Sequence, residues 1–438
     1  MATPPKRRAG GGAAGPTVAV AVAAGFVVEL VLLAVWQRNG YWEFSDGVYA
    51  QSAREFLHGI MPYRDFAAGQ PPLVFLLGVG LLAIHDGLAS LRAGAAFADL
   101  ITAVLVGLCV WRLTGLRAVA VATALVSPLL PIGLHEHAQF VPETFAAPLL
   151  LAGALLCARP HRAEGGGVLL ALAVMCKLAF AVPALAIALS TRYRREATLT
   201  LIVALVLFAI ASVAAFGDGV WRDAVHAQSQ VGIASLHYVG GLIAQGAWNE
   251  LPLVLPAAAG VWLVWTERQQ APDPELMRTL VAATLAGLLL ALTVFKRGSW
   301  INVLVVAEPP LLVLAAAGAA WSARRSPAAW MAIVLLAALL TAQVVSLLVD
   351  PADPLIAKRP GAQSGLAWTA GPATVDRTVD KARRCPPVLA YSGDPYFAFL
   401  SDRRMPGNQP GEQLFTTEHA PVDAAFAQRA NADQPRCP

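Results

Sequence analysis

Long, uninterrupted apolar runs constrain this chain more than any other feature of its sequence. The segments 17–36 and 328–349 each approach the ~20 residues that a helix needs to cross a bilayer. The composition agrees, because 57% of the 438 residues are hydrophobic and only 14% are charged, whereas soluble domains are about a quarter charged. Such runs exclude a soluble enzyme and a disordered chain, and their lack of alternation excludes a membrane β-barrel. We therefore predict an all-α polytopic membrane protein.

The positions of lysine and arginine predict which ends of the apolar runs lie inside, because these residues favour the cytoplasmic side. Lys6, Arg7 and Arg8 place residues 1–16 in the cytoplasm as a disordered N-terminus, and the run 17–36 is interpreted as a retained anchor. About eleven crossings in total would keep the arginine-rich turns inside. The further spans are predicted at about 91–112, 118–134, 141–158, 166–177, 179–191, 198–216, 251–266, 278–295, 302–321 and 328–349.

One apolar run is too short to be counted as a crossing. The segment 71–84 would reverse the sidedness of every later span, so we interpret it as a helix in the outer interface. The first extracytoplasmic loop, about 37–90, is then long and carries interfacial helices. A second long outer segment is expected at about 217–250. Residues 17–349 as a whole are expected to form the transmembrane domain.

The C-terminal part, residues 350–438, is polar and is predicted to be a small extracytoplasmic α/β tail domain. It contains a strand-like piece at 388–391 and a helix-like piece at 395–401. Because an outer compartment permits disulfides, Cys385 and Cys437 could pair there. Two free thiols are the alternative.

Acidic residues near the predicted outer surface are candidates for chemistry. Glu43, Asp46 and Asp65 lie in the first outer loop, and a carboxylate can act as general base toward a hydroxyl group. The alternative is that they are solvated loop acids that pair with Arg54 and Arg64.

A second polar cluster lies between two predicted spans. His135, Glu136 and His137 precede Glu143, and histidines with carboxylates are a possible metal site. Two histidines beside one glutamate are a weak metal signal, and polar residues at a span end can simply mark the water interface. No metal ligand is therefore assigned, no cofactor is certain, and a divalent metal remains possible.

Three cations and one amide near predicted span ends are further candidates. Lys177 lies in an apolar stretch, where a lysine usually pairs with an anion, faces a cavity or extends to the headgroups. Lys296 and Arg297 lie at a predicted outer turn just before Asn302, against the cytoplasmic preference of basic residues. Two cations there could hold a lipid phosphate, and ordinary headgroup contact is the alternative.

Several chemistries find no support in the sequence. It contains no phosphate-binding glycine loop, no Ser-His-Asp order and no His-Glu-x-x-His motif. No basic stripe interleaved with aromatic residues indicates a nucleic-acid partner. Any donor must therefore reach an outer site, and a lipid-linked donor does so without a soluble pool.

The order of these motifs resembles that of the GT-C superfamily of polytopic glycosyltransferases, in particular bacterial protein O-mannosyltransferases and lipid A aminoarabinose transferases. Individually the motifs are degenerate, and the resemblance depends on their order over most of residues 17–350. It departs where Asp46 is followed by a glycine instead of a second acid, which weakens any expectation of a metal. The segments that carry it are 45–50, 59–66, 70–73, 133–143, Lys177 and 296–302.

The resemblance implies an inverting glycosyltransferase in the bacterial cell membrane. A polyprenyl-phosphate sugar would be the donor, a lipid, glycan or protein would be the acceptor, and membrane lipid would surround the site. Asp46 would take the proton from the acceptor hydroxyl, and cations would stabilise the departing lipid phosphate. The residues expected to bind substrate are Tyr49, Arg64, Asp65, Glu136, Glu143, Lys177, Lys296, Arg297 and Asn302.

Other functions fit parts of the pattern. A secondary transporter or lipid flippase would explain charges inside predicted spans, such as Glu29 and Asp99. A glycan polymerase or ligase would use the same kind of donor with a polymeric acceptor. A non-catalytic scaffold would tolerate the replacement of its acids by amides.

Overall fold

The computed structural model describes most of the chain between the first outer loop and the tail. In that part the chain is almost wholly helical, and the only β-type pairings are two isolated bridges, Pro62 with Phe66 and Ile233 with Lys296. The strand-like piece 388–391 lies outside the described residues, as do six of the candidate residues: Glu29, Glu43, His135, Glu136, His137 and Arg297. The described residues are 25, 27, 31, 44–130, 139–229, 233–266, 272–296, 301–349, 372–385 and 395–405.

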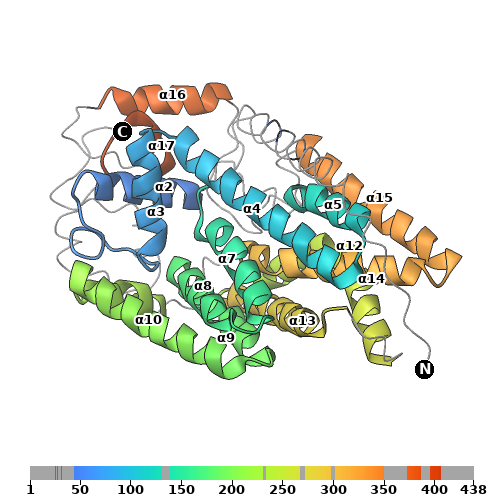
Figure 1. Ribbon diagram of the computed structural model, residues 1–438. Helices are drawn as coiled ribbons and strands as arrows, with labels where there is room; N and C mark the ends of the chain where they lie inside the picture. The colour runs from blue at the N-terminus through green and yellow to red at the C-terminus, as the bar shows by residue number, and fades with distance from the viewer. Residues whose placement is uncertain are drawn as a thin grey trace.

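The helices form an elongated bundle, with α4, α10 and α15 running along its length (Figure 1). The helices α2, α3, α16 and α17 gather at one end, which we call the loop end (Figure 1). Short 3₁₀ turns at Ser127–Leu129, Leu178–Phe180, Leu290–Phe295 and Ile301–Val306, and a π-helical turn at Arg222–Ala227, connect or extend the helices. The α-helices are α2 (Phe44–Leu57), α3 (Leu73–Ile84), α4 (Leu88–Thr114), α5 (Arg117–Val126), α7 (Pro142–Cys157), α8 (Ala163–Cys176), α9 (Ala181–Ser190), α10 (Arg194–Phe216), α11 (Gly219–Trp221), α12 (Leu236–Thr266), α13 (Pro274–Leu289), α14 (Glu308–Ala323), α15 (Pro327–Val349), α16 (Pro372–Arg383) and α17 (Pro395–Ser401).

Within the described residues, 4 helical segments are long and apolar enough to cross a membrane: Leu88–Thr114, Arg194–Phe216, Val239–Thr266 and Pro274–Phe295. Shorter apolar helices accompany them, so the chain is a multi-pass membrane protein. The α-helical class that the apolar runs predict is confirmed. The total of about eleven crossings and the α/β tail remain predictions.

Helices lie where the described apolar runs predict them, with one shifted boundary. The run expected at 91–112 is α4, and the helix-like tail piece 395–401 coincides with α17. The helix α12 begins at Leu236, well before the predicted span start at residue 251. Asn249 and Glu250 lower the local hydropathy and mask a helix that continues through them.

Glycines allow two of the central helices to approach closely. A Cβ built on Gly260 of α12 would lie 2.6 Å from the Cα of Gly318 in α14, and a Cβ on Gly318 would collide with the carbonyl of Pro256. Only glycine fits at such a backbone contact, and small residues play this role at helix interfaces in membranes. The pair α12–α14 therefore forms a close-packed centre, lined by Leu253, Ala257 and residues of α14.

At the loop end, part of the tail packs onto the first outer loop. Phe399 of α17 is buried in one hydrophobic cluster with Tyr49 of α2 and Phe75 of α3. Cys385 of the tail is disulfide-bonded, while Cys437 lies outside the described residues. The first loop and the tail thus share a hydrophobic core although more than half of the sequence separates them.

Candidate active site

Asp46 is fully buried near the beginning of α2. The Arg92 guanidinium donates to its Oδ2 through Nη2 (2.7 Å) and Nε (3.2 Å), and the Phe140 backbone N–H donates to Oδ1 (2.8 Å). The side chains of Arg92 and Asp46 are 4% and 0% exposed. A negative charge is also favoured in the first turn of a helix. Asp46 therefore joins α2 to α4 and to the segment before α7.

Glu143 occupies a comparable place at the beginning of α7. Pro142 precedes it in the first helical turn, where proline loses no hydrogen bond. The Lys177 ammonium donates to Glu143 Oε1, and Asn302 Nδ2 donates to the same oxygen at 3.0 Å. Glu143 is 1% exposed, and its buried Oε2 has no hydrogen-bond partner among the residues that the structure describes. The site thus holds one carboxylate oxygen that a ligand hydroxyl could occupy.

Lys177 reaches Glu143 because the helix is interrupted at this residue. The helix α8 ends at Cys176, and Lys177 has an extended backbone (φ −157°, ψ 125°) before the next turn begins at Leu178. The side chain is 19% exposed. Of the interpretations of this lysine, the structure shows pairing with an anion.

Lys296 adds a second cation to this neighbourhood. Its ammonium donates to the neutral amide oxygen of Gln228, and its backbone forms a bridge with Ile233. Burial lowers the pKa of Lys296 from 10.5 to about 8, and the nearby positive charge of Lys177 contributes. Lys177 is paired with Glu143, whereas the described hydrogen bond of the Lys296 ammonium goes to a neutral amide, so an added anion would relieve the repulsion between the two lysines.

The segment 139–145 connects the two buried carboxylates. Phe140 contributes the N–H that binds Asp46, and Glu143 follows shortly after it. The rings of Phe140 and Phe145 meet edge to face, with centroids 5.4 Å apart. A ligand bound at Glu143 would thus be linked to Asp46 through a short, packed stretch of backbone.

Three other predicted residues lie elsewhere in the first loop. Arg64 is 65% exposed and pairs with its neighbour Asp65 at 2.7 Å, and this hydrogen bond raises the pKa of Arg64. Asp65 also accepts the Met61 backbone N–H at 2.8 Å. Tyr49 is buried against Phe75, with ring centroids 6.3 Å apart. No described contact brings these three residues to Glu143.

Sequence reasoning missed two residues of this site. Arg92 lies inside a predicted span, and a buried arginine in an apolar run needs a counter-charge; this signal could have marked Arg92 as a paired residue, without indicating which acid is its partner. Gln228 is neutral and lies in a polar segment, so no local pattern marked it. Among the described residues, no group of three or more His, Cys, Asp or Glu is placed to hold a metal ion.

No protein-family model and no curated protein sequence matches the chain. Among the solved structures that resemble it is ArnT from Cupriavidus metallidurans in the apo state, with a TM-score of 0.62, 17% identity and coverage of 96% of this chain and 88% of that chain. The same protein bound to undecaprenyl phosphate gives a TM-score of 0.59 at 17% identity, with coverages of 90% and 86%.

The Archaeoglobus fulgidus oligosaccharyltransferase, in complex with Zn and sulfate, also resembles the chain. It gives a TM-score of 0.51 at 13% identity and covers 94% of this chain and 66% of that chain. At such low identities the likeness concerns the fold. The resemblance is therefore borne out in the fold, which the chain shares with ArnT and with the oligosaccharyltransferase.

Proposed function

We propose that this protein is an integral membrane glycosyltransferase that uses a polyprenyl-phosphate-linked sugar as donor. The acceptor would be a hydroxyl group of a lipid, glycan or protein on the extracytoplasmic face. The observation that carries the proposal is a cluster in which the partly buried Lys177, Lys296 and Asn302 gather near the buried Glu143. The fold supports it, because the ArnT that shares this fold has been solved with undecaprenyl phosphate.

The two lysines supply positive charge for a lipid phosphate that leaves the sugar. As the glycosidic bond breaks, negative charge grows on the phosphate oxygens, and preorganised cations in a dry site stabilise that charge. Lys177 is already neutralised by Glu143, whereas Lys296 is bound to the neutral Gln228. We assign Lys296 as the principal phosphate ligand and Lys177 as its support.

Asp46 is proposed as the general base. The acceptor oxygen would form its bond to the anomeric carbon while the bond from that carbon to the phosphate oxygen breaks, which inverts the centre. The hydroxyl proton would pass to Asp46, a step of the kind that contributes ~10²–10⁴-fold to the rate. Both Asp46 oxygens are occupied by Arg92 and Phe140, so the acceptor would have to share or displace one of these donors.

The other candidates keep supporting roles in the proposal. The free Oε2 of Glu143 suits a sugar hydroxyl, and Asn302 fixes the orientation of that carboxylate. Tyr49, Arg64, Asp65, Glu136 and Arg297 are proposed to contribute to the acceptor or headgroup side. The proposed location is the bacterial cell membrane, with a cytoplasmic N-terminus and an extracytoplasmic tail.

Complementation of a deletion strain tests the proposal. Lipids, envelope glycans and glycoproteins would be profiled by mass spectrometry after restoring wild type, Asp46→Asn, Glu143→Gln or the control Glu164→Gln, an exposed acid of α8. We expect one sugar-bearing species to return with wild type and the control but not with Asp46→Asn or Glu143→Gln. If Asp46→Asn restores it at matched protein level, Asp46 is not the base.

A second candidate function, secondary transport or lipid flipping, is favoured by one observation. Asp99, Glu250 and Glu308 are buried acids within apolar helices, at 1%, 3% and 2% exposure. Acids at such positions often mark ion or substrate pathways. A transporter would need a sealed membrane, and this requirement separates the two functions.

A further inference from the structure

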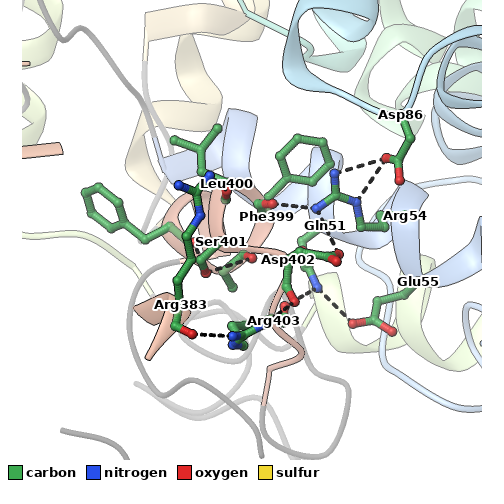
Figure 2. Close-up of polar contacts among 12 residues, drawn as sticks. Gln51, Arg54, Glu55, Asp86, Arg383, Phe399, Leu400, Ser401, Asp402 and Arg403 are labelled. Atoms are coloured by element: carbon green, nitrogen blue, oxygen red, sulfur yellow. Dashed lines mark hydrogen bonds and ion pairs between the residues drawn. The ribbon is translucent and has the colours of Figure 1, made fainter. Parts of the chain in front are cut away.

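Arg54, in the last turn of α2, is a junction between three parts of the chain (Figure 2). Its guanidinium donates to Asp86 Oδ1 through Nε (3.1 Å) and Nη2 (3.0 Å), which joins α2 to the turn before α4. Its Nη1 donates to the backbone carbonyl of Phe399 in α17. Arg54 is 8% exposed, so these contacts replace nearly all of its hydration.

The tail segment 395–405 is seated on α2 by more than this one hydrogen bond. The Phe399 ring lies under the guanidinium, with Cζ 3.7 Å from the ring centroid, a favourable cation–π arrangement. One turn before Arg54, the Gln51 amide donates to the Arg403 carbonyl at 3.1 Å and to Glu55 at 2.8 Å. Figure 2 shows these groups converging between α2 and the tail.

The same helix carries Asp46, about two turns before Arg54. At its first turn α2 is held by Asp46, which binds Arg92 and the Phe140 N–H. At its last turn α2 is held by Arg54 and the tail. A helix of this length is rigid, so the two attachments together define its rotation and its position.

We propose that Arg54 is a positioning residue, through which the docked tail segment 395–405 holds α2 so that Asp46 keeps its place beside Arg92 and Phe140. This inference depends on the proposed function, because it concerns the same reaction. Arg54 itself touches neither donor nor acceptor in this scheme. Its effect passes along α2 to the carboxylate.

Only arginine can make these contacts together. The planar guanidinium presents donors in fixed directions and stacks on an aromatic ring, whereas a lysine ammonium is a point charge. Arg54→Lys keeps the charge opposite Asp86 but loses the simultaneous bond to the tail. We therefore expect Arg54→Lys to release the tail segment 395–405 as Arg54→Ala does. Its overall stability should be like that of the wild type.

The experiment uses the purified full-length protein in detergent, with Arg54→Ala, Arg54→Lys, Phe399→Ala and the double variant Arg54→Ala/Phe399→Ala. The control is Arg384→Ala, an exposed arginine of the same tail. Transfer kinetics are measured as release of polyprenyl phosphate from a polyprenyl-phosphate sugar, with a membrane extract supplying the acceptor, and amide hydrogen exchange is measured on the same preparations. We expect Arg54→Ala and Phe399→Ala to lower kcat about 10- to 100-fold, as small misplacements of a catalytic group do, with little change in KM for the donor.

Hydrogen exchange supplies a readout that is independent of activity. In these variants exchange should accelerate in both 395–405 and 44–57, while the parts of α4 and α7 that are remote from the loop end stay protected. The double variant should be no slower in transfer than the more impaired single variant, because both changes break one connection.

Three results would overturn the inference, and the first two concern kcat. One is faster exchange in 395–405 with unchanged kcat, and the other is loss of kcat in the double variant equal to the product of the single losses. If Arg54→Ala does not fold, Phe399→Ala decides alone, because it leaves the Arg54–Asp86 pair intact. If the wild type transfers no sugar, the proposed function fails. If the tail is released and exchange in 44–57 does not change, the tail does not hold α2, and the inference about Arg54 fails whatever the function.

Discussion

The buried acids Asp46 and Glu143 differ in how their oxygens are used. Asp46 accepts hydrogen bonds on both oxygens, and its charge is balanced by an equally buried arginine. Glu143 accepts two hydrogen bonds on one oxygen, and its other oxygen has no partner within the described part of the chain. Asp46 therefore contributes to holding the helices together, while Glu143 retains capacity for a ligand.

Removing Arg92 should strongly destabilise the protein, because Asp46 is fully buried beside it. Arg92→Met would leave a buried carboxylate without a counter-charge, which typically destabilises a protein by about 3–5 kcal/mol. The double variant Asp46→Asn/Arg92→Met should recover a large part of this loss. Thermal unfolding in detergent measures the stability of each variant. Equal stabilities for Arg92→Met and the double variant would contradict the pairing.

The lowered pKa of Lys296 predicts an alkaline loss of phosphate binding. Because its pKa is about 8, Lys296 loses its charge as the pH rises through 8, and affinity for undecaprenyl phosphate should fall there. The phosphate is itself fully ionised at that pH, so the ligand cannot account for the loss. Arginine stays charged in proteins, and Lys296→Arg should therefore move the loss to higher pH.

Stability should respond to this lysine in the opposite direction. The folded protein holds the Lys296 proton less tightly than the unfolded chain does. The free-energy cost of burying the charged lysine therefore diminishes as the pH rises from about 8 to 10.5, and stability increases. Affinity for the phosphate and stability should thus diverge over this interval.

The binding prediction has its own contradicting outcome. An alkaline loss of phosphate binding that is identical in wild type and Lys296→Arg would show that another group is responsible.

At the scale of helices, the sequence predicts more of the elements than of their contacts. Apolar periodicity is enough to place α4 and α17, because each is bounded by polar or turn residues. It places the start of α12 too late, because Asn249 and Glu250 are buried inside the bundle and look like surface residues in isolation. Nothing local in the sequence indicates that Lys177 pairs with Glu143 or that Arg92 pairs with Asp46, since these contacts depend on how distant helices pack.

The close crossing of α12 and α14 leads to a prediction about packing. Gly318→Val would place a branched side chain against the carbonyl of Pro256, and overpacking of this kind costs about 1–3 kcal/mol or more. Gly240→Val is a matched control on α12, because a Cβ there meets nothing within 4 Å. Thermal unfolding in detergent should show a lower midpoint for Gly318→Val than for the control, and equal midpoints would mean that the helices can separate without loss.

A proline explains a second contact of α12. Pro252 has no N–H for the carbonyl of Trp248, which would otherwise bond four residues along the helix. Gln343 of α15 donates to this carbonyl at 2.8 Å. The side chain thus satisfies a backbone group that the helix leaves open, and it attaches α15 to the centre of the bundle.

At the scale of the whole molecule, the fold is shared with proteins of very low sequence identity, so the site must carry the functional argument. The fold brings residues from α7, the break after α8, the end of the α13 segment and the following 3₁₀ turn to one place. These elements are distant in the sequence. Their order predicted the fold, but only the three-dimensional arrangement shows that four candidates meet and that Arg64 faces solvent.

The two candidate functions make opposite predictions about the need for a membrane barrier. Glycosyl transfer needs the donor, the acceptor and the site, so the full-length protein should convert a polyprenyl-phosphate sugar in detergent micelles as well as in proteoliposomes. Transport needs two compartments and leaves no product in micelles. With a membrane extract added as the source of acceptor, released polyprenyl phosphate, measured by mass spectrometry, reports the reaction whatever the acceptor is.

Variants connect this measurement to the described site. Lys296→Ala should abolish release of polyprenyl phosphate in both settings, because the leaving phosphate loses a cation. Glu143→Gln should abolish it because the sugar loses its carboxylate and Lys177 loses the partner that positions it, while Glu164→Gln should leave release unchanged. A flippase would instead show no release in micelles and a movement of labelled lipid between leaflets that depends on Asp99, Glu250 or Glu308. Such a result would assign the buried acids of the bundle, and not the Lys177–Lys296 cluster, to the central function.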